Sequence, residues 1–495
     1  MRTRTLCHPL LATNLAFQAA SLGAGLPSSG GGKTPLGEEG GLIVSVALLR
    51  KPARPRRSRV DTTRAASGPL WRQYLKALGP GLVTGASDDD PSGIATYSQA
   101  GAKFGFGLLW AGLVTLPLMA AVQEICDRTA LATAKSLGEL AAERFAKRGR
   151  VVIAVLLVAL IGANALNIAA DLAAIGEGVH LLHAGPPWLW ALLAGAGTTV
   201  LVMTGSFETI ARVFKVLCVA LLAYLGVLFV VKVDWLSVAS HTFVPHITFS
   251  AAYLMLLVAV LGTTISPYLF VWQSAHRIEE LRDEPEGGED AVTLDSRSTA
   301  GEKKKVRTSR GDVFTGMTFS NVVMFAIIVS TAVTLGRHGN HDVASAAEAA
   351  RALRPIAGRL SSVLFAAGFV GAGFLAVPVL AGSGSAGLSG LLGKRWGFSR
   401  SLRDAPVFYG LVFAGTVGGT ALTLLGINTM KLLVVVAVVN GLAAAPFLVV
   451  VMLISKDPGI MGEHRNGRLA RTLGWLTVGV MAAAAIALVA TGGGM

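Results

Sequence analysis

The chain has 495 residues, of which 53% are hydrophobic and only 15% are charged, and its mean hydropathy is +0.60. A soluble protein carries roughly 25% charged residues, so the composition excludes an ordinary soluble domain and predicts a polytopic membrane protein. The formal charge of +14 would also suit a nucleic-acid-binding protein. Topology-determined lysines and arginines in the loops explain it more simply, so we expect a lipid bilayer and no nucleic acid as partner.

The first 70 residues differ in composition from the rest and are rich in Gly, Ser, Pro and Arg. The apolar stretch 41–49 is too short to cross a bilayer. We predict that 1–70 is a disordered basic segment and that 71–495 is the transmembrane domain. The arginine-rich run 50–59 is interpreted as a solvated tail, with a lipid-binding or targeting role as the alternative.

Apolar runs close to the roughly 20 residues needed to span a bilayer recur through the rest of the chain. They predict spans at 77–102, 105–126, 151–175, 187–204, 208–231, 251–275, 313–336, 361–390, 406–426, 431–454 and 470–491. A basic amphipathic segment, 127–150, joins the second and third spans. The mixed-charge segment 277–312 is expected to be a solvated cytoplasmic loop, and 342–357 an external helix.

Most loop lysines and arginines lie in the loops that share a side with the N-terminus. Positive charge in loops marks the cytoplasmic side. We therefore expect a cytoplasmic N-terminus, in a protein of the plasma membrane.

The first span is interrupted by Asp88-Asp89-Asp90-Pro91-Ser92-Gly93. Carboxylates at membrane depth are rare and mark functional sites, and backbone freed from the helix is tolerated only where it lines protein or a polar cavity. We expect Asp90 to point into a cation site, beside the backbone carbonyls that the break frees. Asp88 and Asp89 are assigned to a vestibule or a proton route. The alternative is a charged helix end at the membrane surface.

The sixth span is interrupted by a similar motif that surrounds Pro267. Thr263, Ser266 and Tyr268 place oxygen atoms beside backbone that the proline frees from the helix. The alternative is a proline kink whose hydroxyls bond to their own helix. Interrupted spans at matching places in two halves of a transporter indicate a binding site near the bilayer midplane.

Spans 1–5 and 6–10 form two five-helix units, with the break in the first helix of each. Because five is odd, the second unit enters the membrane from the opposite side. The fold class expected is therefore all-α, with a LeuT-type 5+5 inverted repeat, about eleven transmembrane helices and an extra last helix.

The first span resembles the opening of the natural resistance-associated macrophage protein (NRAMP) family of divalent metal transporters. The likeness covers roughly 75–491 and is most specific at Gly79-Pro80-Gly81, Asp90-Pro91, Ala95-Thr96, Gln99-Ala100-Gly101-Ala102, Phe104-Gly105 and Leu108-Leu109-Trp110. It implies that Asp90 and the position of Gly93 bind the metal. In the sixth span it implies the same for Ser266 and for the carbonyl of Thr263.

This chain departs from the family pattern at several of those positions. Ser266 stands where the family has a methionine, Tyr268 where it has a histidine, and Gly93 where it has an asparagine. A thioether selects transition metals, and a hydroxyl is a hard ligand that suits Mg²⁺, which gives up its water reluctantly. The chain therefore resembles the NRAMP-related magnesium transporter branch most.

The third span bears on proton coupling. Asp171 matches a family aspartate that serves the proton route, but the family's titratable groups fall on Asn164, Ala174 and Gln273 here. Weak or no proton coupling is expected. Asp171 is a candidate for the proton route or for a structural role.

Other polar residues are weaker candidates for the metal site. Asn440, beside Gly441 in the tenth span, is a candidate ligand, with a helix–helix hydrogen bond as the alternative. Gln123, Glu124 and Asp127 are interpreted as a solvated helix end. The three cysteines have no metal-ligand spacing, no catalytic motif is found, and we expect no enzyme activity, no cofactor and no obligate protein partner.

The function predicted is secondary transport of divalent metal, Mg²⁺ or Mn²⁺, with weak or no proton coupling. The first alternative is a proton-coupled manganese/iron importer of the same family. The second is a symporter of a small organic solute on the same fold, against which the aspartate in the first break argues.

Overall fold

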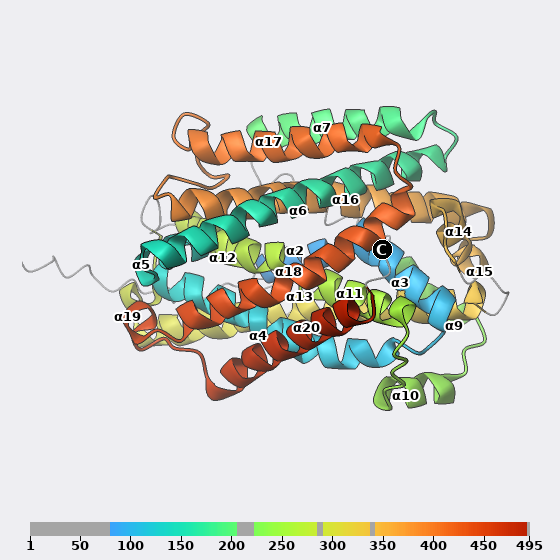
Figure 1. Ribbon diagram of the computed structural model, residues 1–495, viewed down its shortest axis with the longest axis horizontal. Helices are drawn as coiled ribbons and strands as arrows, with labels where there is room; N and C mark the ends of the chain where they lie inside the picture. Colours follow the sequence, from blue (N-terminus) through green and yellow to red (C-terminus); the bar gives the residue numbers. More distant parts are fainter. Residues whose placement is uncertain (1–79, 205–221, 285–290, 337–341, 493–495) are drawn as a thin grey trace, which may run out of the picture. The chain divides into compact units, whose positions relative to one another are not determined.

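The computed structural model describes residues 80–204, 222–284, 291–336 and 342–492, which form helices joined by turns and short connections (Figure 1). The helices of the first half are α2 (Pro80–Asp88), α3 (Pro91–Phe104), α4 (Leu109–Thr133), α5 (Leu137–Arg144), α6 (Lys147–His180), α7 (Pro187–Thr204), α9 (Leu222–Val230) and α10 (Trp235–Phe243). Those of the second half are α11 (Ala251–Thr264), α12 (Pro267–Asp283), α13 (Thr299–Thr334), α14 (Ala346–Arg351), α15 (Arg354–Ala357), α16 (Ser361–Leu391), α17 (Pro406–Leu422), α18 (Thr429–Ser455), α19 (Pro458–Met461) and α20 (Arg468–Ala490).

Within the described ranges, 9 helical segments are long and apolar enough to cross a membrane. They agree with the predicted spans to within a few residues at most ends, and the predicted start at 187 matches that of α7. The first predicted span is divided between α2 and α3, each too short to be counted alone. The fifth, 208–231, lies largely outside the described residues, with α9 in its last part. The segment 1–70 also lies outside them.

Both interruptions occur where a proline follows a residue that caps a new helix. Pro91 opens α3 after Asp90, and Pro267 opens α12 after Ser266. Proline has no N–H to donate to the preceding turn and disfavours helical backbone in the residue before it. At the first position of a helix neither property is a disadvantage, so each proline ends one half-helix and begins the next.

The broken helices lie inside the bundle. Of the apolar stretch in Ala251–Asp283, 94% is buried within the protein, against 22% in Arg468–Ala490. Helix α6 packs against α16, α7 and α17 on one side of the bundle (Figure 1), and α18 packs against α11 and α20. The interior position of the broken helices keeps their free backbone groups out of lipid, as hydrogen-bond satisfaction in a membrane requires.

Helix α2 approaches α13 so closely that it depends on glycine. A Cβ atom built on Gly85 would lie 2.1 Å from the carbonyl oxygen of Gly316, and one on Gly81 would lie 2.5 Å from the backbone nitrogen of Val313. Small residues permit such backbone approach between membrane helices. The contact sets the position of α2, and with it that of the aspartates at its end.

Two expectations about charged helix ends need correction. The segment 277–312 is not simply a solvated loop, because α12 continues to Asp283, α13 already begins at Thr299, and Arg277 is buried. Asp127 and Gln123 do not form a solvated helix end, since both are buried. The hydropathy pattern underestimated the length of these helices and the burial of their ends, because their charged residues pair with one another inside the bundle.

Candidate metal transport site

Asp90 occupies the break between α2 and α3 and is buried. Its backbone is extended, which makes it the N-cap of α3. Oδ1 accepts hydrogen bonds from the Gly93 backbone N–H at 2.9 Å and from the Ser92 hydroxyl at 2.5 Å. A capping carboxylate of this kind is held in one orientation by the helix it begins. The Gly93 N–H is thus engaged with the carboxylate predicted to bind the ion.

The second break meets the first at the other oxygen of Asp90. Tyr268, in the first turn of α12, donates its hydroxyl to Asp90 Oδ2 at 3.2 Å. The same hydroxyl lies 3.5 Å from the carbonyl oxygen of Ser87 at the end of α2. The structure therefore brings together Asp90 and Tyr268, which are 178 residues apart.

The hydroxyls of Thr263 and Ser266 are turned toward backbone carbonyls. Ser266 Oγ lies 2.5 Å from the carbonyl oxygen of Gly262 and 3.1 Å from that of Thr263. Thr263 Oγ1 lies 3.0 Å from the Tyr97 hydroxyl and 3.0 Å from the Val260 carbonyl. Both hydroxyls thus bond to carbonyls of their own span, which was the alternative for this motif. The side chains of Thr263, Ser266 and Tyr268 are all buried.

Asp88 and Asp89, which were assigned to a vestibule or a proton route, are fully buried. The Ser320 hydroxyl of α13 contacts both, donating to Asp88 Oδ2 and lying 3.3 Å from Asp89 Oδ1. In the described part of the chain, Asp88 Oδ1 and Asp89 Oδ2 have no hydrogen-bond partner. Three carboxylates therefore stand within one helical turn, and their combined charge favours a cation.

Asp171 on α6 is the fourth buried carboxylate of this region. Neither of its oxygens has a hydrogen-bond partner among the described residues, and it is near enough to Asp90 and Tyr268 for its charge to act on both. Asn164, two turns earlier on α6, instead donates to the Leu380 carbonyl at 2.8 Å and lies 3.0 Å from Ser383 Oγ. Asn164 therefore joins α6 to α16.

Asn440 forms a reciprocal amide pair with Asn167. Each Nδ2 donates to the other's Oδ1, at 3.1 Å from Asn440 and 3.2 Å from Asn167. Both residues are buried, and the pair joins α18 to α6. This arrangement is the helix–helix hydrogen bond that stood as the alternative to a ligand role, and it directs the Asn440 amide toward α6.

The donor atoms around Asp90 fit a hard divalent cation. They are carboxylate, hydroxyl and carbonyl oxygens, the ligands that Mg²⁺ and Mn²⁺ accept. A carboxylate offers about four acceptor positions, and among the described residues Asp90 Oδ2 accepts one hydrogen bond, from Tyr268. The described residues contain no group of three or more His, Cys, Asp and Glu arranged to hold a metal ion, so such a site relies on Asp90, neutral oxygens and water.

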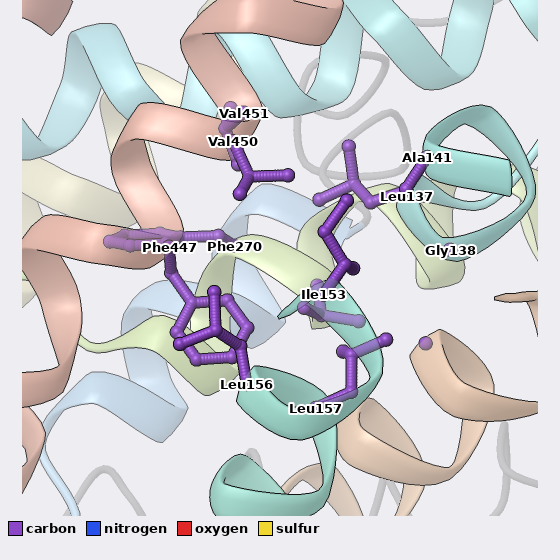
Figure 2. Close-up of a pocket in the computed structure, with 12 residues that line it drawn as sticks. Leu137, Gly138, Ala141, Ile153, Leu156, Leu157, Phe270, Phe447, Val450 and Val451 are labelled. Atoms are coloured by element: carbon purple, nitrogen blue, oxygen red, sulfur yellow. The ribbon is translucent and has the colours of Figure 1, made fainter. Parts of the chain in front are cut away.

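A separate hollow lies between α5, α6, α12, α16 and α18 (Figure 2). Its wall is entirely apolar and consists of Leu137, Gly138, Ala141, Ile153, Leu156, Leu157, Phe270, Val271, Gly387, Phe447, Val450 and Val451. A cation needs polar ligands, so this hollow is not a place for the ion.

Sequence reasoning missed several residues that the structure places at the site. Tyr97, Ser92 and Ser320 each contact a predicted residue, and Asn167 pairs with Asn440. A helical pattern offered a signal for Asn167, because residues 164, 167 and 171 are spaced by three and four and share one face of a helix. Ser320 had no such signal, since its partner lies 232 residues away.

The chain matches the family described as natural resistance-associated macrophage protein-like over residues 81–491. A relative from Aeromonas hydrophila subsp. hydrophila, named divalent metal cation transporter MntH, is 27% identical over 430 residues, which are 83% of this chain and 95% of the relative. A solved structure of an Eremococcus coleocola manganese transporter has a TM-score of 0.66 at 17% identity and covers 87% of this chain and 89% of that one. Mhp1, a nucleobase-cation-symport-1 family transporter, has a TM-score of 0.53 at 12% identity over 88% of this chain and 94% of its own.

The fold and the buried site define a polytopic membrane transporter with a LeuT-type arrangement, as the sequence predicted. The chain belongs to the natural resistance-associated macrophage protein family. The resemblance drawn from the first span is thereby confirmed, and the protein is a transporter and not an enzyme.

Proposed function

We propose that this protein moves divalent metal cations across the plasma membrane, with Mg²⁺ or Mn²⁺ as cargo and with weak or no proton coupling. The N-terminus is on the cytoplasmic side in this proposal, in keeping with the distribution of loop charge. The relatives named as divalent metal cation transporters support the general activity. The residues at the two breaks support the finer choice of ion.

The observation that carries the proposal is the contact between Asp90 and Tyr268. It joins the two helix breaks at one carboxylate oxygen, in a buried place surrounded by hard oxygen donors. A cation that enters displaces the Tyr268 hydrogen bond and takes the charge of Asp90 as its partner. The hydroxyls of Ser266 and Thr263 must rotate, or water must take their place, before either break completes the coordination.

The absence of a thioether at Ser266 supports a hard cargo. A methionine sulfur discriminates in favour of transition metals, whereas hydroxyl and carbonyl oxygens do not. An ion that keeps part of its water shell also suits a site in which Asp90 is the carboxylate that contacts the second break. Mg²⁺ behaves in this way, and Mn²⁺ accepts the same oxygen ligands.

The residues that stand in place of the family's titratable groups support weak proton coupling. Asn164 bonds to α16, and Gln273 bonds to Thr84 and Asp127. Both are neutral amides, which neither gain nor lose a proton at physiological pH. Asp171 is the one titratable residue of that pattern present in this sequence.

A proton-coupled manganese importer is the second candidate. The relatives named for manganese favour it, as does the retention of Asp171 in a buried position. Such a protein would prefer Mn²⁺ strongly over Mg²⁺ and would acidify the compartment that the metal enters.

Metal uptake by the purified full chain in proteoliposomes tests the proposal. Mn²⁺ entry would be followed while Mg²⁺, Ca²⁺, Fe²⁺ and Cd²⁺ compete in turn. We expect Mg²⁺ to compete at concentrations close to those of Mn²⁺. Competition by Fe²⁺ and Cd²⁺ with no effect of Mg²⁺ would support the second candidate, and no metal uptake at all would contradict both.

A further inference from the structure

The apolar hollow of Figure 2 lies close to the ends of three of its helices. On α5, Arg144 follows the wall residue Ala141 by three positions. On α6, Arg150 precedes the wall residue Leu157 by seven positions. Helical residues spaced by three or seven share one face, so both arginines continue the faces that line the hollow. Lys456 follows the last residue of α18, the third helix.

Side-chain contacts bring these three helix ends together. Arg144 Nε pairs with the carboxylate of Asp457, the residue after Lys456. Arg150 Nε donates to the carbonyl oxygen of Phe145, at the end of α5, at 2.9 Å. The Arg144 guanidinium lies over the Phe145 ring, 5.7 Å from its centroid. The hollow therefore has a charged mouth, which consists of Arg144, Arg150, Lys456 and Asp457.

The mouth has an excess of positive charge. Its three cations are exposed, and its one carboxylate, Asp457, is already engaged by Arg144. The neighbouring carboxylate of Glu143 is engaged as well, by Lys135. An anion that approaches the mouth therefore meets a positive surface.

The mouth lies where the lipid-facing surface of α6 begins. Val151, the residue after Arg150, is 58% exposed, and Val155 and Val158 further along are exposed too. Apolar side chains that a membrane-spanning helix leaves exposed face the acyl chains of the bilayer. A helix rises about 1.5 Å per residue, so Leu157 lies about 10 Å deeper than Arg150. The mouth is thus at the level of lipid headgroups and the hollow at the level of acyl chains.

We propose that an anionic phospholipid binds here, with its phosphate at the mouth and one acyl chain in the hollow. A chain in the hollow gains van der Waals contacts with a wall of apolar residues. The mouth supplies the selection, because basic pockets between membrane helices bind anionic headgroups. In the proposed topology this end of α6 is cytoplasmic, the side whose leaflet carries anionic lipid.

The lipid site goes beyond the proposed transport activity and uses none of the residues around Asp90. It still adjoins a broken helix, because Phe270 and Val271 of α12 belong to the wall of the hollow. The bound acyl chain therefore contacts the half-helix that carries Tyr268.

Native mass spectrometry of the full-length chain in a neutral detergent tests the site. The delipidated protein is titrated with phosphatidylglycerol or with phosphatidylcholine of the same acyl chains, so that the two probes differ only in the headgroup. Arg150→Gln and Lys456→Gln each remove one charge of the mouth. The matched control is Arg148→Gln, which removes a charge from the same turn of α6 on the face of Val155, away from the hollow.

We expect the parent to bind one phosphatidylglycerol about tenfold more tightly than phosphatidylcholine. Arg150→Gln and Lys456→Gln should each lower phosphatidylglycerol affinity about fivefold and leave phosphatidylcholine affinity unchanged, while Arg148→Gln should bind both like the parent. Asp457→Asn keeps a side-chain oxygen to cap α19 and should raise phosphatidylglycerol affinity, because it removes the carboxylate of the mouth. Val450→Trp fills the hollow and should weaken both lipids.

Equal affinity of the parent for the two lipids overturns the site, and so does an equal loss in Arg148→Gln, because the lipid then belongs to the general shell around the protein. Parent-like binding by Val450→Trp overturns the placement of the acyl chain in the hollow. Melting temperatures of all variants identify any loss that comes from unfolding, and the exposed Lys456 gives a second test of the mouth if Arg150→Gln unfolds. The assay contains no metal, so its result is independent of the proposed cargo.

Discussion

Tyr268 and Asp90 connect the two broken helices through one hydrogen bond of 3.2 Å. Each residue is within two positions of the proline that interrupts its own span. Through this contact, one oxygen of the Asp90 carboxylate, Oδ2, is shared between the half-helices α3 and α12. A metal ion that replaced the Tyr268 proton at Asp90 would remove the hydrogen bond that joins α12 to α3. Ion binding would then change how these two helices are held together.

Asp90→Asn should remove metal binding. The variant keeps the shape and the N-cap acceptor but loses the one charge that contacts the second break. We expect Mn²⁺ and Mg²⁺ affinity to fall by at least about 100-fold, or about 2.7 kcal/mol, as measured by calorimetric titration. The protein should remain inserted and monodisperse, because a neutral amide is easier to bury than a carboxylate.

Asp88→Asn and Asp89→Asn serve as the matched comparison. They should weaken binding less, through long-range attraction only. Because both carboxylates are buried, that effect should depend little on ionic strength. If Asp90→Asn binds metal like the parent while Asp88→Asn or Asp89→Asn loses most of its metal binding, the ion lies beside Ser320 and not at Asp90.

Ser266→Met should change selectivity. It introduces a thioether beside the second break, and soft ligands favour Mn²⁺, Fe²⁺ and Cd²⁺ over Mg²⁺. A tenfold change in the Mg²⁺-to-Cd²⁺ affinity ratio, about 1.4 kcal/mol, is expected in competition assays. Ser266→Ala is the control that removes the hydroxyl without adding sulfur. Equal ratios in all three proteins would exclude Ser266 from the site.

Metal entry should occur without stoichiometric proton entry. The reason is that Asn164 and Gln273 carry amides where the family has titratable groups. A pH-sensitive dye inside proteoliposomes reports the result during Mn²⁺ or Mg²⁺ uptake. Acidification that follows uptake, and that disappears in Asp171→Asn, would instead establish coupling through Asp171.

The Asn167–Asn440 pair should contribute to stability more than to ion binding. Asn167→Leu removes the partner of the buried Asn440 amide, and Asn440→Leu leaves Asn167 Oδ1 without its donor while Nδ2 keeps the Ala163 carbonyl. A buried polar group that loses its partner costs about 1–3 kcal/mol. Thermal unfolding should show both single variants destabilised, and the double leucine variant should recover part of the loss. A large fall in metal affinity in Asn440→Leu alone would restore the predicted ligand role of Asn440.

Gly85→Ala should destabilise the protein. Its Cβ would lie 2.1 Å from the Gly316 carbonyl oxygen, and overpacking of this kind costs about 1–3 kcal/mol. The matched control is Gly418→Ala in α17, where a Cβ meets open space and alanine favours the helix. Comparable melting temperatures for the two variants would show that α2 and α13 can separate freely at this point.

The sequence by itself determined the class, the family and most of the spans. The length of an apolar run reflects the thickness of the bilayer it must cross, so the start of α7 was predicted correctly. The helix breaks were equally predictable, because Pro91 and Pro267 act on the residues beside them whatever the rest of the chain does. The burial of Asp90 followed from the apolar segments on either side of it.

Only the tertiary structure decided which distant groups meet. Tyr268 finds Asp90, Asn440 finds Asn167, and Arg277 finds Asp127 and Asp312. These pairs depend on how each helix is rotated about its axis and on which helices are neighbours, and no local pattern encodes either. For that reason the charged ends near Asp127 and Arg277 were predicted to be solvated, although they neutralise one another inside the bundle.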